Sequence, residues 1–349
     1  MKSFFTLAIL LSFQAKFVLA LTKEDYKNTL NRGINGEIEE RIDDFREKAL
    51  NVHLLFTKES YQKKFFSSDS GYINIMFSPA VRKQQNENLA TSKKKRLEKK
   101  FFNVNEGKLA FTTNIEGIFV KIENAIRAKK GEESFFYAFA KYQGSLKTIE
   151  NKKYDLIFSP RMEKYDLTNS YGQYTLLVNE DAHLFSENDD ETEKFLLYAL
   201  KKATKGNEDV KSKTKDYLKR MFSQAIEYVC KVDFGDIRFR NLPFTKDGRL
   251  AAIDIDSRTA DEGIKTLLDS YFVLGFFGGA LGEQEVIQLF GLVKKACSKK
   301  NYLGLLDLLK IDRKKFELLI AQNALSDSLK GLIKTNYKKM MKKIDDLNI

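Results

Sequence analysis

The sequence has few of the residues that build several common kinds of site. Its 349 residues include no Trp, two His, two Cys and three Pro. The two His and two Cys lack metal-ligand spacing, which argues against a zinc site, and two Cys are too few for a disulfide framework. His183 has no Ser or Cys partner in the setting of a nucleophile elbow. Zinc chemistry and nucleophilic-triad catalysis therefore gain no support.

The composition is that of a folded, soluble protein. Hydrophobic residues make up 43% of the chain and charged residues 31%, a balance that supports one or two domains with sizeable cores. Sixty Lys and Arg against 48 Asp and Glu give a net charge of +12. A basic surface suits phosphates, nucleic acid or anionic lipid, and the charge alone does not choose between them.

Residues 1–20 have the pattern of a secretory signal peptide. Lys2 precedes an apolar run over residues 4–13, and residues 18–20 form a small-residue cleavage signal. Lys16 interrupts the apolar segment, which argues against a membrane-spanning helix. We therefore expect export to the periplasm or the medium, the alternative being a short apolar N-terminal helix.

The two cysteines, Cys230 and Cys297, have two interpretations. Exported proteins often oxidise an isolated pair to a single long-range disulfide. In the other interpretation both are buried free thiols. The sequence alone leaves this choice open.

Hydrophobic spacing predicts an α+β segment followed by a mainly helical one. The basic run at residues 93–100 is interpreted as a solvated surface, and the glycine-rich residues 276–282 as a turn between helices. The elements expected before Glu191 are one or two amphipathic helices within 21–66, a strand at 72–77, paired strands at 109–114 and 117–123, a helix at 132–142, and a strand at 154–162 that Pro160 ends.

Residues 233–256 carry most of the functional information. Two short strand-like pieces, 240–244 and 249–255, are joined by residues 245–248, whose Asp-Gly is a strong hairpin signal. A hairpin would bring oxygen-bearing side chains together at one rim, which suits a hard cation such as Mg²⁺. These side chains are Asp236, Asn241, Asp254 and Asp256.

The spacing of Asp236 and Asn241 resembles the Asp-x-x-x-x-Asn catalytic loop of protein kinases and of aminoglycoside and choline phosphotransferases. Phe234-Gly235-Asp236 is similar to the His-Gly-Asp of the small-molecule kinases, and Ile253-Asp254 to their metal motif. The resemblance implies that Asp236 is the catalytic base and that Asn241 and Asp254 hold Mg²⁺ against the phosphates of ATP.

The preceding segments agree in order with a kinase-like small lobe. Such a lobe needs a strand Lys for the phosphates and a following helix with a Glu that holds it. The resemblance assigns Lys121 to the first role and Glu132 or Glu133, preferentially Glu133, to the second. Residues 156–160 would then lead into a hinge near 161–163.

The resemblance implies an α+β, two-lobed, protein-kinase-like fold. Residues 1–20 are the signal peptide, and 21–100 a helical N-terminal extension with the start of the small lobe. Residues 101–165 form the small lobe. Residues 166–349 form a mostly helical large lobe that carries the catalytic hairpin.

The chain also departs from the pattern of that family. Phe234 and Arg238 stand where histidines are expected, Ile255-Asp256 replaces Phe-Gly, and no Gly-x-Gly-x-x-Gly precedes Lys121. Asp256 has two interpretations, a second metal ligand or a helix N-cap.

The expected function is that of an exported phosphotransferase that moves the γ-phosphate of ATP to an unidentified hydroxyl acceptor, a small molecule or a protein, with Mg²⁺. One alternative is a catalytically dead pseudokinase that acts as a secreted binding or scaffold protein. Another is a binder of nucleic acid or of an anionic lipid surface. No RNA-binding aromatic motif or zinc finger supports specific nucleic-acid recognition.

Overall fold

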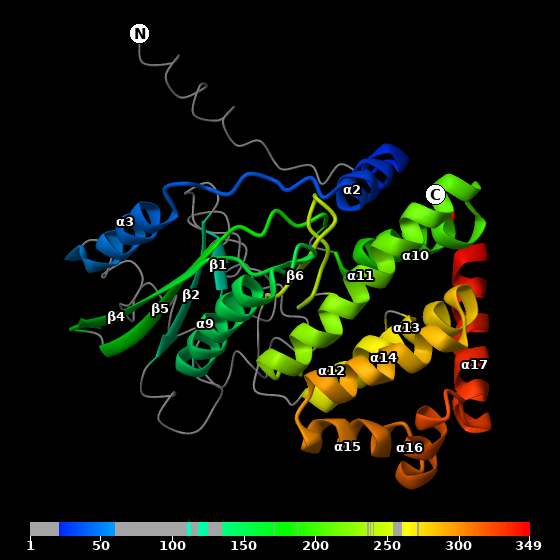
Figure 1. Ribbon diagram of the computed structural model, residues 1–349. Helices are drawn as coiled ribbons and strands as arrows, with labels where there is room; N and C mark the ends of the chain where they lie inside the picture. Colours follow the sequence, from blue (N-terminus) through cyan, green and yellow to red (C-terminus); the bar gives the residue numbers. More distant parts are fainter. Residues whose placement is uncertain are drawn as a thin grey trace, which may run out of the picture.

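A small antiparallel sheet lies at one end of the computed structural model and a group of packed helices at the other (Figure 1). The chain is therefore α+β, as predicted. The structure describes residues 21–59, 110–112, 118–124, 135–170, 172–186, 188–235, 237, 239, 241–253, 260–270 and 272–349. The predicted signal peptide, the strand at 72–77 and the basic run at 93–100 lie outside these residues.

The strands are β1 (Ala110–Thr112), β2 (Ile118–Asn124), β3 (Ile157–Phe158), β4 (Met162–Asn169), β5 (Gly172–Glu180) and β6 (Leu250–Ala251). Strands β2, β4 and β5 of the main sheet are the longest, and the others have two or three residues. The helices are α2 (Lys23–Asn35), α3 (Phe45–Thr57), α9 (Phe135–Lys152), α10 (Asp189–Lys205), α11 (Glu208–Val232), α12 (Ala260–Ser270), α13 (Val273–Gly275), the π-helix η1 (Phe276–Leu281), α14 (Glu283–Ala296), α15 (Lys299–Leu308), α16 (Arg313–Ala321) and α17 (Asp327–Asp345).

The main sheet has the strand order β1-β2-β5-β4, and each pair of neighbouring strands in it is antiparallel. The predicted pairing of the two segments around residue 115 is confirmed, with Phe111 opposite Val120. Helix α9 follows β2 in the chain and is longer than the predicted helix. It connects the sheet to the helical part, because the Tyr142 hydroxyl accepts a hydrogen bond from the Met162 backbone N–H and Ser145 pairs with the Tyr228 hydroxyl.

The predicted strand at 154–162 and the hinge near 161–163 need correction. Only β3 forms there, parallel to β6, and the chain then continues into the β4–β5 hairpin of the main sheet. The expected boundary after residue 165 therefore lies inside β4, and the sheet extends to Glu180. The sequence of β4, MEKYDLTN, is largely polar, so it lacks the apolar alternation that marks a half-buried strand.

Helix α11 is the centre of the helical part. It has 25 residues and contacts α2, α9, α10, α12, α14 and β3. The side chain of Asn207 caps its first turn by accepting the Val210 N–H at 3.0 Å. Its buried face includes Tyr217, Phe222 and Tyr228. Among the described residues, no single helix is both long and apolar enough to cross a membrane.

The N-terminal extension contains two helices, where the sequence predicts one or two. Helix α2 starts with a capping box between Thr22 and Asp25 and buries Tyr26 and Leu30 against α10 and α11. Helix α3 packs on β4 and β5 (Figure 1). Residues 36–44, which we call the strap, connect the two helices and cross the surface between the sheet and the helical part.

Hydrogen bonds to two buried carboxylates, those of Glu180 and Asp247, hold the strap against the rest of the protein. The carboxylate of Glu180, at the end of β5, accepts hydrogen bonds from Arg41 Nη2 at 2.6 Å and from Arg161 Nη2 at 2.7 Å. The Glu39 N–H donates to Asp247 Oδ2 at 3.0 Å, and Asp247 also pairs with Arg249. We call the five side chains Arg41, Arg161, Glu180, Asp247 and Arg249 the ionic clamp.

The ionic clamp closes around an aromatic ring. The guanidinium carbons of Arg41 and Arg249 lie 4.7 and 4.8 Å from the centroid of Phe158. Burial acts to raise the pKa of Glu180, but hydrogen bonds from Arg161 and Arg41 outweigh it and the pKa is lowered. The pKa of Asp247 is lowered in the same way, because hydrogen bonds from Arg249 and Thr245 outweigh its burial. Both carboxylates are therefore held ionised.

Candidate functional site

The hairpin predicted from Asp247-Gly248 is present. The Gly248 N–H donates to the Thr245 carbonyl at 3.0 Å, and the Thr245 N–H to the Arg249 carbonyl at 2.8 Å. Gly248 has φ +78, a left-handed conformation that favours glycine, and an added Cβ would lie 2.8 Å from the Thr29 carbonyl of α2. The turn is thus fitted against the N-terminal extension. Its strands are shorter than predicted, and β6 pairs with β3.

The open end of this hairpin brings Asn241 beside Ile253. The Ile253 N–H donates to the Asn241 carbonyl at 3.0 Å, and Asn241 is 1% exposed. Asp254 follows Ile253 directly in the chain, and Asp236 stands between the buried residues Gly235 and Ile237. Asp236 and Asp254 themselves lie outside the described residues, as does Asp256. Of the predicted metal-binding pair, the structure therefore places Asn241 and the residue that precedes Asp254.

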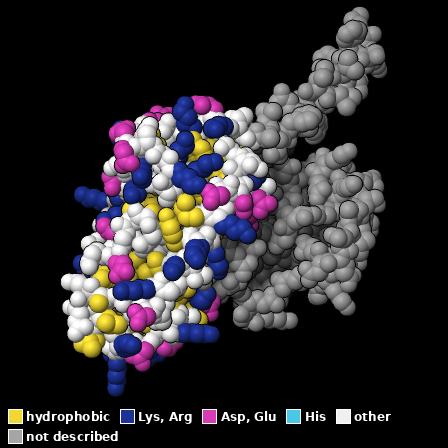
Figure 2. All heavy atoms as spheres, turned by 90° about the vertical axis from the view of Figure 1, so that its right-hand side faces the viewer, with side chains coloured by type: hydrophobic (Ala, Val, Ile, Leu, Met, Phe, Trp, Pro, Cys, Tyr) yellow, Lys and Arg dark blue, Asp and Glu magenta, His cyan; other side chains and the backbone are white. Residues whose placement is uncertain are grey.

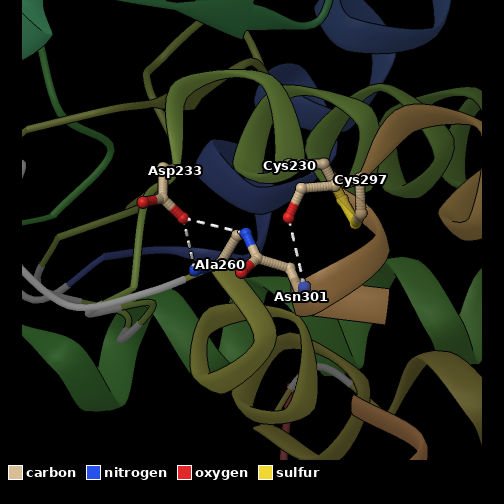
Figure 3. Close-up of a disulfide and its surroundings, with 6 residues drawn as sticks. Cys230, Asp233, Ala260, Cys297 and Asn301 are labelled. Carbon is tan, nitrogen blue, oxygen red and sulfur yellow. Dashed lines mark hydrogen bonds between the residues drawn. A yellow bond between two sulfur atoms is a disulfide. The ribbon is translucent and has the colours of Figure 1, made fainter. Parts of the chain in front are cut away.

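A second connection joins the same two segments farther along. Asp233, which ends α11 in a left-handed conformation, accepts hydrogen bonds from the Ala260 N–H at 2.8 Å and from Asn301 Nδ2 at 3.1 Å (Figure 3). Its backbone carbonyl accepts from Lys141 Nζ of α9 at 2.8 Å. The loop that starts at Asp233 and the chain that ends at Ala260 are therefore tied at both ends, here and at Asn241.

Helix α12 lies very close to the loop. A Cβ added at Gly263 would stand 2.2 Å from the carbonyl oxygen of Phe234 and 3.1 Å from Gly235 Cα. Both contacts are with backbone, which cannot swing aside as a side chain would. Only glycine permits this approach.

Gly263→Ala is expected to lower the free energy of unfolding by about 2–3 kcal/mol, because the methyl group forces α12 and the loop apart. Chemical denaturation followed by circular dichroism measures the change. The matched control is Gly291→Ala on α14, where nothing lies within 4 Å of the added Cβ, and where alanine should be neutral or stabilising. Equal stability of the two variants would show that the close approach is not required.

Cys230 and Cys297 form a disulfide, which decides between the two interpretations of the cysteines (Figure 3). Their Cα atoms are 4.6 Å apart. Cys230 lies on the last turn of α11, and Cys297 immediately follows α14 and precedes Ser298, the N-cap of α15. The bond therefore joins the helix that leads into the loop to the start of the helix that carries Asn301.

The residues predicted for nucleotide binding are only partly described. Lys121 lies on β2, an interior strand of the sheet, and its backbone is opposite Leu177 of β5. Glu133 and Glu132 precede α9 and lie outside the described residues. The glycine-rich residues 276–282 are not a simple turn, because most of them form the π-helix η1 packed against α17.

Sequence reasoning did not single out Asp233, Gly263 or Asn301. Asp233 had one available signal, since it ends a long helical pattern directly before the Phe-Gly-Asp motif, and Asp is enriched among the non-glycine residues that adopt the left-handed conformation. Asn301 and Gly263 have no local signal, because their partners lie far away in the chain. Within the described residues, His, Cys, Asp and Glu side chains form no cluster that could hold a metal ion.

No protein-family model matches the chain, and no curated protein matches its sequence. The functional conclusion therefore depends on the chain's own residues and their arrangement.

Proposed function

We propose that the chain is an exported, kinase-like phosphotransferase that moves the γ-phosphate of ATP to a hydroxyl acceptor. The observation that carries this proposal is the hydrogen bond between the Ile253 N–H and the Asn241 carbonyl. It closes the hairpin so that Asn241 and the residue before Asp254 are neighbours. That is the arrangement required if both side chains are to hold one cation.

The order of the elements supports the proposal. A strand with a Lys, a following helix and further strands of the same sheet precede a long helix, and the Asp236–Asn241 loop and the hairpin come next. Kinases use a strand Lys and a helix Glu for the phosphates, and a loop Asp and Asn with a later Asp for catalysis and metal binding. In the proposed two-lobed arrangement the junction would lie after Glu180, where β5 ends.

The donor set fits Mg²⁺. Carboxylate and amide oxygens are the ligands that this ion takes, usually from one or two carboxylates together with phosphates. Asn241 and Asp254 would hold it, and when bound it would neutralise charge on the phosphate oxygens. Asp236 would accept the proton of the acceptor hydroxyl, and Lys121 with Glu133 would position the phosphates. Catalysis would then come mainly from positioning and electrostatics.

Export is part of the proposal. Residues 1–20 have the signal-peptide pattern, and the disulfide between Cys230 and Cys297 is of the kind that persists in oxidising compartments. ATP is scarce in the periplasm and in the medium. The enzyme would therefore work in a lumen supplied with nucleotide or after delivery to another cell.

A pseudokinase that acts as a secreted binding or scaffold protein is the second candidate. It is favoured by Phe234, which stands where the related loops have His, is fully buried and packs edge-on against Tyr228 with ring centroids 6.4 Å apart. A position filled by a packed aromatic ring has no polar role in a reaction. The missing glycine-rich motif before Lys121 does not distinguish the two candidates, because active small-molecule kinases often lack it as well.

The basic surface gives weaker support to an anionic partner. Figure 2 shows Lys and Arg side chains spread over the face around α17 and interspersed with Asp and Glu. Lys343 pairs with Glu193, and Lys330 lies 3.8 Å from Glu283. Helix α17 buries Ile333, Met340 and Ile344 and exposes its lysines, which is the arrangement of an amphipathic helix that packs through its apolar face and keeps its lysines in water.

Mg²⁺ with ATP is expected to raise the unfolding temperature of the protein by about 5 °C at nucleotide concentrations near a hundred times Kd, because the ligand binds only the folded state. Asp254→Ala should abolish this rise, whereas Asp216→Ala, an exposed position on α11, should retain it. Thermal unfolding with ATP, with Mg²⁺ and with both measures the effect.

Two outcomes would contradict the phosphotransferase. If millimolar ATP with Mg²⁺ leaves the unfolding temperature unchanged, the scaffold candidate replaces it. If ATP with Mg²⁺ raises the unfolding temperature of Asp254→Ala as much as that of the wild type, Asp254 is not a metal ligand. Salt-sensitive binding to nucleic acid in the same preparation would favour the third candidate.

A further inference from the structure

Asp233 joins three parts of the chain at the base of the candidate site. Its carboxylate Oδ1 accepts from the N–H of Ala260, the first residue of α12, and from the side-chain amide of Asn301 on α15. The first N–H groups of a helix have no partner within the helix. Ala260 is fully buried and Asn301 is 9% exposed, whereas Asp233 is exposed, so its carboxylate serves two buried residues from the surface of the protein.

The disulfide fixes the second of these partners. Cys230 lies one turn before Asp233 on α11, and Cys297 immediately precedes Ser298, whose Oγ accepts the Asn301 N–H at 3.1 Å (Figure 3). The covalent bond therefore holds the start of α15 against the end of α11. Because Asn301 lies in the first turn of α15, the disulfide keeps it close to Asp233.

The position of this network in the chain gives it a role. Asp233 begins the loop that contains Asp236 and Asn241, and Ala260 follows the segment that begins at Asp254. The hydrogen bond from Ile253 to Asn241 joins the two segments at their near ends. The bond from Ala260 to Asp233 joins them at their far ends, so the two bonds together limit how far the segments can separate.

We propose that Asp233, held through Asn301 by the Cys230–Cys297 disulfide, is the positioning residue that sets the catalytic loop against the metal-binding segment. The inference rests on the proposed function, because its expected consequence is tighter binding of ATP with Mg²⁺. The network itself makes a prediction without nucleotide, namely slow amide exchange at the start of α12.

Two substitutions separate the side-chain contacts of Asp233 from its backbone conformation. Asp233 has φ +56, which asparagine and glycine both adopt easily. Asp233→Asn keeps an oxygen that accepts from Ala260 and Asn301, whereas Asp233→Gly keeps the backbone conformation and removes the acceptor. A loss seen in the glycine variant alone is therefore a loss of these hydrogen bonds.

Hydrogen exchange followed by mass spectrometry, without nucleotide, is the first readout. We expect amides at the start of α12 to exchange about tenfold faster in Asp233→Gly and about as in the wild type in Asp233→Asn. The second readout is the Kd for ATP with Mg²⁺, measured well below the unfolding temperature. It should rise about tenfold in the glycine variant and by less than about threefold in the asparagine variant.

The outcomes distinguish the inference from the proposed function. Unchanged exchange in Asp233→Gly overturns the inference, even where the wild type binds ATP. Faster exchange with an unchanged Kd also overturns it, because Asp233 would then be structural only. If the wild type binds no ATP with Mg²⁺, the proposed function fails, and the positioning role fails with it whatever the exchange shows.

Discussion

Glu180→Ala is expected to lower the free energy of unfolding by about 3–5 kcal/mol, because it leaves charged partners of a buried carboxylate without their counter-charge. The Glu180 side chain is 1% exposed, and those of Arg41 and Arg161 are 37% and 28% exposed. Without Glu180 the guanidinium groups of Arg41, which lies over Phe158, and of Arg161, which lies over Phe45, lose their common counter-charge and repel each other. Denaturant unfolding of the variant and the wild type measures the loss.

Glu163→Ala on β4 is the matched control. Glu163 pairs with Arg46, whose side chain is 90% exposed, and such surface pairs contribute about 0–1 kcal/mol. A loss at Glu180 no larger than that at Glu163 would contradict the structural role assigned to the ionic clamp.

A second variant at the same position, Glu180→Gln, tests the pH dependence of the ionic clamp. Because the pKa values of Glu180 and Asp247 are lowered in the folded protein, their contribution is complete above their ordinary values of about 4 and is lost as pH falls through the lowered values. The stability difference between the wild type and Glu180→Gln should therefore be constant near neutral pH and shrink in acid. A difference that grows on acidification would contradict this sign.

Replacing both cysteines, Cys230→Ser with Cys297→Ser, is expected to lower the free energy of unfolding by about 4 kcal/mol in the chain-entropy description. The cysteines are 67 positions apart, so the disulfide removes many conformations from the unfolded chain. Denaturant unfolding of the oxidised wild type and the double variant measures the effect.

A reducing agent provides the control for this prediction. It should lower the stability of the wild type toward that of the double variant and leave the double variant unchanged. Thiol labelling of the unfolded, unreduced wild type should find no free thiol, because no free cysteine remains in the structure. Two labelled thiols would mean that the purified protein lacks the disulfide.

Local chemistry explains which features the sequence could predict. The Asp247-Gly248 turn is encoded within four residues, and the helices of the N-terminal extension by apolar spacing, so both were predicted and both are present. The hairpin also predicts that its two ends come together, and in the structure Asn241 lies beside Ile253 there. The roles of Asp236, Asp254, Lys121 and Glu133 stay predictions.

Features that depend on distant partners could not be predicted in this way. Nothing near Arg41 indicates that it pairs with Glu180, and nothing near Asp233 indicates Asn301, because these contacts arise only when the chain is folded. The β4–β5 hairpin was missed for a different reason, since the polar sequence of β4 hides its alternation. The sheet boundary was therefore placed too early.

The strap also affects the order in which a growing chain can fold. Glu180, the partner of Arg41, follows it by 139 residues in the chain, and Asp247, the partner of Glu39, follows it by 208. During synthesis, the strap therefore stays unpaired until these later parts of the chain have followed. Such late closure slows folding and leaves the strap open to chaperones and proteases.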